Sequence, residues 1–180
     1  MNIIFLTGMP AAGKTYWGTR VAEAYGFPFI DLDEYIIQRE REDIRQLFSK
    51  GEGWFRAKEH ASLIGLIGMI KRPTIIATGG GTPCFFNNLK QMQRSGTLIY
   101  LKARIETLAS RIGADEQVRP LLRGRQNTKE VLQQLLCERE RFYEQASYIL
   151  QTEDISLSTF DEIIPECINK HSQQGLSLQW

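Results

Sequence analysis

Short apolar runs alternate with longer amphipathic stretches along this chain, and this alternation indicates the fold. The runs of strand length, rich in β-branched and aromatic residues, are 3–7, 29–31, 74–78, 97–101 and 148–150. The stretches with helical spacing are 14–24, 34–41, 54–70, 83–94, 105–112, 128–142 and 158–170. Such alternation is typical of a parallel sheet covered by helices on both faces, so we predict an α/β fold of three layers (α/β/α) with five parallel strands.

Local sequence signals add expectations for the last helix, the C-terminal tail and one internal connection. Ser158 and Asp161 have the spacing of a capping box for the last helix, and Pro165 predicts a kink in it or a later start. The arginine-rich segment 113–127 is longer than most connections in compact domains, so we expect a mobile lid there. We expect the tail 172–180 to be frayed.

Length and charge narrow the class of protein. With 180 residues, 42% hydrophobic and 24% charged, the chain fits one globular domain over 1–180. A formal net charge of +1 gives no basic field for nucleic acid or an anionic membrane. The sequence shows neither a signal peptide nor a membrane span, and its three cysteines have no metal-binding spacing, so we expect reduced, partly buried thiols. We predict a cytoplasmic monomer.

The strongest motif is a phosphate-binding loop that follows the first strand and opens the first helix. It reads Gly8, Met9, Pro10, Ala11, Ala12, Gly13, Lys14, Thr15, which matches GxxxxGK[ST] without a mismatch. Backbone N–H groups and the helix dipole converge on phosphates at such a turn, and a lysine there reaches the β- and γ-phosphates of ATP. The alternative is a glycine-bearing turn that matches by chance.

Such a loop occurs in kinases, GTPases, motors and inert nucleotide-binding modules alike. The NKxD and DxxG motifs of GTPases are absent. Neither 74–78 nor 97–101 ends in aspartate, so the usual Walker B acid is missing as well. We therefore expect Asp31, at the end of the second strand, to accompany Thr15 as a Mg²⁺ ligand.

The acceptor side is predicted from a second carboxylate and a run of glycines. If 31–33 is extended, Asp31 and Asp33 lie on one side of it, and Asp33 would orient and deprotonate an acceptor hydroxyl. The alternative is that Asp33 only caps the helix predicted from Glu34. Gly79, Gly80 and Gly81 follow a strand and allow a ligand close to the backbone, although a plain flexible turn is possible.

Two helical arginines are candidates for binding an acidic substrate. Arg56 and Arg139 carry the planar guanidinium that binds a carboxylate bidentately. Isolated helical arginines are more often solvated or paired with glutamate, and the sequence alone favours that ordinary interpretation for each.

Taken in order, these motifs resemble the shikimate kinase family over residues 3–150. The matching segments are the phosphate loop, 31–33, GEGWFR at 51–56, 79–81, VRPLL at 118–122 and RERFY at 139–143. The resemblance implies a nucleoside-monophosphate-kinase-like fold with a mobile lid, and MgATP-dependent phosphorylation of the 3-hydroxyl of shikimate in aromatic amino acid biosynthesis.

The resemblance also implies roles for individual residues. Asp33, Arg56, Gly79, Gly80, Gly81 and Arg139 would contact shikimate, with both arginines on its carboxylate. Arg119 would move in with the lid towards the transferring phosphoryl group, and Arg111 would lie against the adenine, although their spacing is stretched. Ala11 departs from the family's usual glycine, which predicts a stiffer or differently curved loop.

Two other functions stay open at this point. Gluconate kinases share the phosphate loop and a carboxylate-bearing, hydroxylated acceptor. A non-catalytic nucleotide-binding module would be expected to lack Asp33 or Arg119, and this chain has both.

Overall fold

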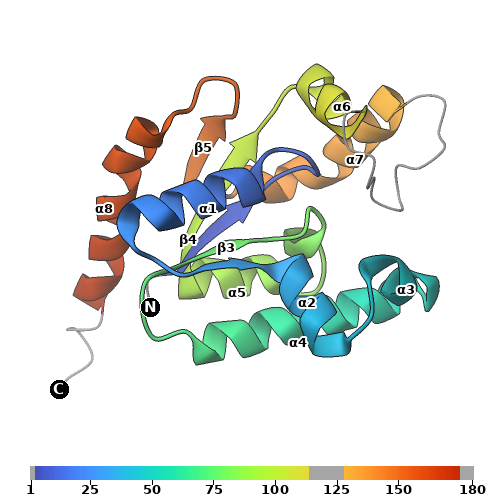
Figure 1. Cartoon of the computed structure of the whole chain (residues 1–180), viewed down its shortest axis with the longest axis horizontal. Helices are drawn as coiled ribbons and strands as arrows, with labels where there is room; N and C mark the ends of the chain where they lie inside the picture. The colour runs from blue at the N-terminus through green and yellow to red at the C-terminus, as the bar shows by residue number, and fades with distance from the viewer. Residues whose placement is uncertain (1–2, 114–127, 175–180) are drawn as a thin grey trace.

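The computed structural model describes residues 3–113 and 128–174, with backbone alone for 169–174, and its centre is a parallel sheet. The strands are β1 (Ile3–Thr7), β2 (Phe29–Asp31), β3 (Thr74–Ala77), β4 (Gly96–Lys102) and β5 (Tyr148–Gln151). Their spatial order is β2-β3-β1-β4-β5, and every neighbouring pair is parallel (Figure 1). The predicted fold class is confirmed, and each predicted strand matches its observed counterpart to within one residue at either end.

Helices cover both faces of this sheet, and β1 shows why. Ile4 and Leu6 point into one hydrophobic cluster, and Ile3 and Phe5 into the other, because successive side chains of a strand alternate between faces. All four are essentially inaccessible to water. A strand buried on both sides has to be continuously apolar, which is the pattern seen in the sequence.

The helices divide between the two clusters. Those that contribute to the cluster of Ile4 and Leu6 are α1 (Lys14–Tyr25), α6 (Ile105–Gly113), α7 (Thr128–Tyr143) and α8 (Leu157–Gln174). Those that contribute to the other cluster are α2 (Leu32–Glu40), α3 (Ile44–Ser49), α4 (Glu52–Met69) and α5 (Asn88–Ser95). Among residues 3–113 and 128–174, no helix is both long enough and apolar enough to cross a bilayer.

The sequence prediction missed α3 entirely. This helix begins with a capping box in which Asp43 accepts from Gln46 N and Gln46 Oε1 accepts from Asp43 N. The D-x-x-Q spacing was therefore a usable signal. Leu47 anchors the helix in the core, since its side chain is fully buried.

The predicted helix over 83–94 is wrong. Its first part is a 3₁₀ turn, η1 (Thr82–Cys84), and α5 starts only at Asn88. Between them Phe85 is extended and Phe86 has a φ of 51°, a left-handed conformation that breaks helical hydrogen bonding. η1 follows the glycine run directly and contacts α4 and α5.

The predictions for the end of the chain need three corrections. Ser158 and Asp161 form no capping box: α8 already begins at Leu157, and Asp161 accepts from the Tyr25 hydroxyl at 2.5 Å. The later start predicted from Pro165 is also wrong, because Pro165 lies inside α8. The helix continues to Gln174, so 172–174, the first residues of the predicted tail, are helical. Residues 175–180 and the predicted lid from 114 to 127 lie outside the described residues.

The three cysteines form no disulfide, as predicted. Cys167 is buried and Cys84 half-buried, whereas Cys137 is exposed, contrary to the expectation that all three are partly buried.

Candidate active site

The phosphate loop forms at the carboxyl end of β1, the central strand. Gly8 has a φ of 138° and Gly13, which caps α1, has a φ of 93°, so both adopt conformations that favour glycine. A Cβ atom on Gly8 would lie only 2.5 Å from the carbonyl oxygen of Leu101. The glycines are thus required both by the backbone and by the neighbouring β4 chain.

Ala11 also has a left-handed backbone, with a φ of 62°. Its carbonyl oxygen accepts a hydrogen bond of 3.1 Å from Arg111 Nη1 of α6. Ala11 thus has a backbone conformation that glycine adopts without strain and that disfavours any other residue by roughly 1–2 kcal/mol. Arg111 lies across the loop beside Gly13, which is the neighbourhood expected for a residue near a bound nucleotide.

Lys14 lies under the loop. Its ammonium group donates to the carbonyl oxygens of Gly8 at 3.0 Å and Met9 at 2.8 Å, and the side chain is buried. The cation is thereby held at the turn whose N–H groups would surround phosphates.

The two predicted metal ligands are in contact. Thr15 Oγ1 donates to Asp31 Oδ2 at 2.7 Å, which joins the start of α1 to the end of β2. Asp31 Oδ1 accepts from the backbone N–H groups of Asp33 and Glu34, so Asp31 is the N-cap of α2. The alternative role of Asp33 as the helix cap is therefore wrong. Also wrong is the premise of an extended 31–33 segment, because Asp33 lies in the first turn of α2.

The predicted acceptor residues converge on the glycine run. A Cβ atom on Gly79 would lie 3.0 Å from Asp33 Oδ1, and one on Gly80 would lie 3.4 Å from Arg139 Nη1. A Cβ atom on Gly81 would overlap the guanidinium group of Arg56. Side chains from α2, α4 and α7 thus surround one backbone segment, and the interpretation of 79–81 as a plain flexible turn does not account for this close packing.

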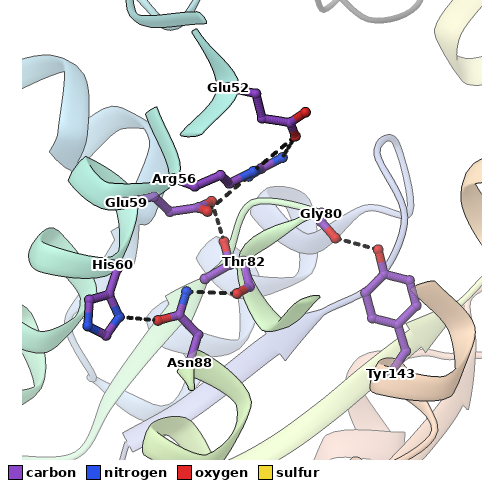
Figure 2. A network of polar contacts seen from close by, with 8 residues as sticks. All are labelled: Glu52, Arg56, Glu59, His60, Gly80, Thr82, Asn88 and Tyr143. Carbon is purple, nitrogen blue, oxygen red and sulfur yellow. Dashed lines mark hydrogen bonds and ion pairs between the residues drawn. The ribbon is translucent and has the colours of Figure 1, made fainter. Parts of the chain in front are cut away.

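The glycine run also packs against the phosphate loop. A Cβ atom on Gly80 would lie 3.0 Å from Pro10 Cδ and 3.4 Å from the carbonyl oxygen of Gly8. The Gly80 carbonyl oxygen accepts a hydrogen bond from the buried hydroxyl of Tyr143 (Figure 2). The predicted nucleotide side and the predicted acceptor side are therefore adjacent, as a direct group transfer would require.

Arg56 and Arg139 are both buried, with exposed fractions of 4% and 8%. Neither is a solvated helical arginine. Arg56 does pair with glutamates, as the ordinary interpretation held, at 2.9 Å to Glu59 and 3.3 Å to Glu52. Among the residues that the structure describes, no carboxylate forms an ion pair with Arg139.

Glu59 is a site residue that the sequence prediction missed. Its side chain is fully buried and receives hydrogen bonds from Arg56 Nη1 and, at 2.7 Å, from Thr82 Oγ1 (Figure 2). Burial raises the pKa of the Glu59 carboxyl, the Arg56 charge and the Thr82 hydroxyl oppose this shift, and the charge of Asp33 adds to it. The available signal was its position three residues after Arg56, on the same face of a helix.

The position of Arg119 lies outside the described residues, so its expected place at the phosphoryl group stays a prediction. The other predicted residues form two adjoining groups. The phosphate loop, Arg111 and Asp31 lie around α1, and Asp33, Arg56 and Arg139 surround the glycine run.

Comparison with known proteins agrees with this arrangement. The family model described as shikimate kinase matches residues 10–171. A shikimate kinase of Bacteroides fragilis is 41% identical over 149 residues, covering 81% of this chain and 82% of the relative.

Solved structures show the same similarity in three dimensions. The shikimate kinase of Bacteroides thetaiotaomicron superposes with a TM-score of 0.84 at 33% identity, covering 91% of this chain and 98% of that one. The Acinetobacter baumannii shikimate kinase, solved in complex with shikimate, has a TM-score of 0.82 at 29% identity and covers 99% and 96%. A gluconokinase of Sinorhizobium meliloti, with a TM-score of 0.62 at 17% identity and coverage of 96% and 97%, shares the fold alone. From its phosphate loop to α8, this chain belongs to the shikimate kinase family.

Proposed function

We propose that this protein transfers the γ-phosphoryl group of ATP to the 3-hydroxyl of shikimate, giving shikimate 3-phosphate and ADP for aromatic amino acid biosynthesis. The observation that carries this proposal is the convergence of Asp33, Arg56 and Arg139 on the glycine run beside the phosphate loop. One carboxylate and two guanidinium groups suit a substrate that has both a hydroxyl and a carboxylate.

On the nucleotide side, the loop N–H groups and Lys14 would hold the phosphates, and Arg111 would lie against the adenine. Oxygen ligands in contact, Thr15 Oγ1 and Asp31 Oδ2, fit Mg²⁺, which usually takes one or two protein oxygens together with phosphates and water. When bound with ATP, Mg²⁺ would neutralise charge on the β- and γ-phosphates.

On the acceptor side, Arg56 and Arg139 would bind the shikimate carboxylate, and the backbone of 79–81 would border the ring. Asp33 would orient the 3-hydroxyl and accept its proton as the oxygen bonds to the γ-phosphorus and the bond to the β-phosphate oxygen breaks. Arg119 would approach the phosphoryl group from the segment outside the described residues. The monomeric state and the cytoplasmic location stay predictions.

The function is tested by a single-turnover assay with radiolabelled ATP and either shikimate or gluconate at equal concentration. We expect label to transfer to shikimate, with little transfer to gluconate, because gluconate offers a carboxylate on an open chain in place of a rigid ring. Faster transfer to gluconate would replace the proposed substrate with a sugar acid. ATP binding without transfer to either would favour a non-catalytic module.

Asp33→Asn should lower kcat by about 10²-fold or more, in the range of a positioned general base, because the amide cannot accept the hydroxyl proton. Since Asp31 caps α2, loss of the Asp33 charge should change the free energy of unfolding by less than about 1 kcal/mol. Steady-state kinetics and denaturant unfolding measure the two effects.

The matched control is Glu34→Gln, which removes the same charge from the neighbouring, exposed position in the same helical turn. Its kcat should stay near wild type. Equal losses of kcat in both variants would show that the charge of the helix terminus matters and that Asp33 is no proton acceptor.

A further inference from the structure

A chain of hydrogen bonds runs away from Arg56 through residues that the proposed reaction does not use (Figure 2). Beyond Glu59 and Thr82, the carbonyl oxygen of Thr82 accepts from Asn88 Nδ2 at 2.9 Å. Asn88 Oδ1 in turn lies 2.6 Å from Nδ1 of His60. This series of hydrogen bonds starts and ends on α4 and passes through η1 and α5, so it connects the helix of Arg56 to the end of the glycine run.

The donor and acceptor atoms of the hydrogen bonds from Thr82 through Asn88 to His60 can be assigned without ambiguity. A carbonyl oxygen only accepts, so the amide nitrogen of Asn88 must face Thr82 and its amide oxygen must face His60. The Nδ1 atom of His60 therefore carries a proton. Asn88 is fully buried. Without the proton on Nδ1 of His60, the amide oxygen of Asn88 would lose this hydrogen bond inside the protein, where buried polar atoms normally have a partner.

His60 has a second contact that offers another explanation. Its ring stacks on Phe86 with 5.0 Å between centroids and 27° between planes. Phe86 is 64% exposed, so this stacking lies at the edge of the molecule, whereas the hydrogen bond points inward. A stacking role and a hydrogen-bonding role require different replacements at position 60.

We propose that His60 and Asn88 are positioning residues for the acceptor site. His60 fixes the Asn88 amide, Asn88 holds the Thr82 carbonyl, and the Thr82 hydroxyl fixes the Glu59 carboxylate that orients Arg56. Neither His60 nor Asn88 needs to touch substrate. The proposal rests on the function proposed above, because it assigns Arg56 to the substrate carboxylate.

The test compares two replacements of His60. His60→Phe keeps a ring for stacking and removes the donor, whereas His60→Asn loses the ring and places an amide nitrogen where Nδ1 lies. We expect His60→Phe to raise KM for shikimate about tenfold, with KM for ATP and kcat within about twofold of wild type, as loss of ground-state binding would give. We expect His60→Asn to stay within about threefold of wild type in all three constants.

The reverse order, with His60→Phe like wild type and His60→Asn impaired, would assign His60 to stacking and overturn the proposal. Equal rises of KM for both substrates would overturn it as well, because they indicate a general structural loss. Thr82→Val and Thr82→Ser give a second pair, in which only valine, which has no hydroxyl, should raise KM for shikimate. A wild-type protein that does not phosphorylate shikimate would refute the proposed function, whereas unchanged variants of an active enzyme would refute only this inference.

Discussion

Lys14→Ala is expected to give a folded protein whose kcat is below roughly one thousandth of wild type, the scale of losing a major group that stabilises transferring charge. The Lys14 ammonium group is held beneath the phosphate loop by the carbonyl oxygens of Gly8 and Met9. Alanine removes the cation that would neutralise the β- and γ-phosphates. Phosphoryl transfer from ATP to shikimate measures the loss.

The matched control is Lys90→Ala, which removes the same charge from an exposed position on α5. It should leave kcat near wild type. The fold of Lys14→Ala is checked by thermal unfolding, because the lost hydrogen bonds contribute about 1 kcal/mol each. A folded Lys14→Ala protein with near wild-type turnover would mean that this loop does not hold the transferred phosphates.

A shikimate analogue with its carboxylate reduced to an alcohol should lose on the order of 10³-fold or more in kcat/KM, as sites built around a polar partner do. Arg139 is buried, and no carboxylate among the described residues forms an ion pair with it. Arg56 has Glu59 as a partner, so the larger share of the loss should come from Arg139, whose charge the analogue leaves unpaired.

A variant comparison tests that explanation. Arg139→Ala should lower kcat/KM for shikimate strongly and make the enzyme nearly indifferent to the carboxylate, so the analogue and shikimate should then differ by about tenfold or less. Arg141→Ala is the control, since Arg141 lies two residues further along α7, is exposed and packs on Phe142. If the Arg139→Ala protein still prefers shikimate to the analogue by the full factor, another group binds the carboxylate.

Parallel strands and the phosphate loop were predictable because their signals are local. A strand buried on both faces must be a continuous apolar run, and β1, β3 and β4 are such runs or nearly so. The loop has glycines of positive φ at 8 and 13, and Gly13 is followed directly by Lys14 and Thr15, so the whole signal lies within eight consecutive residues. The helical break at 85–87 was not predictable in this way, because it depends on the left-handed conformation of Phe86, which nothing in its residue type favours.

The acceptor site shows the limit of local reasoning. The sequence supplied Asp33, Arg56 and Arg139 as candidates, but the periodicity argument for Asp33 was wrong, since α2 begins one residue after Asp31 and makes Asp31 its cap. Only the resemblance predicted the two arginines to be substrate ligands. Their burial depends on packing against elements far away in the sequence, which residue type and spacing do not encode.

By itself, therefore, the sequence determined the fold class, the nucleotide loop and, through its ordered motifs, the family. Tertiary structure decided which side chains act together. Glu59 lies three residues after Arg56 on the same face of α4, so helical spacing brings these two side chains together. Its other partner, the Thr82 hydroxyl, reaches it only because α4 packs against η1. His60 and Asn88, 28 positions apart, meet for the same reason. A buried polar group must find its partner inside the fold, and that partner is chosen by packing and not by distance along the chain.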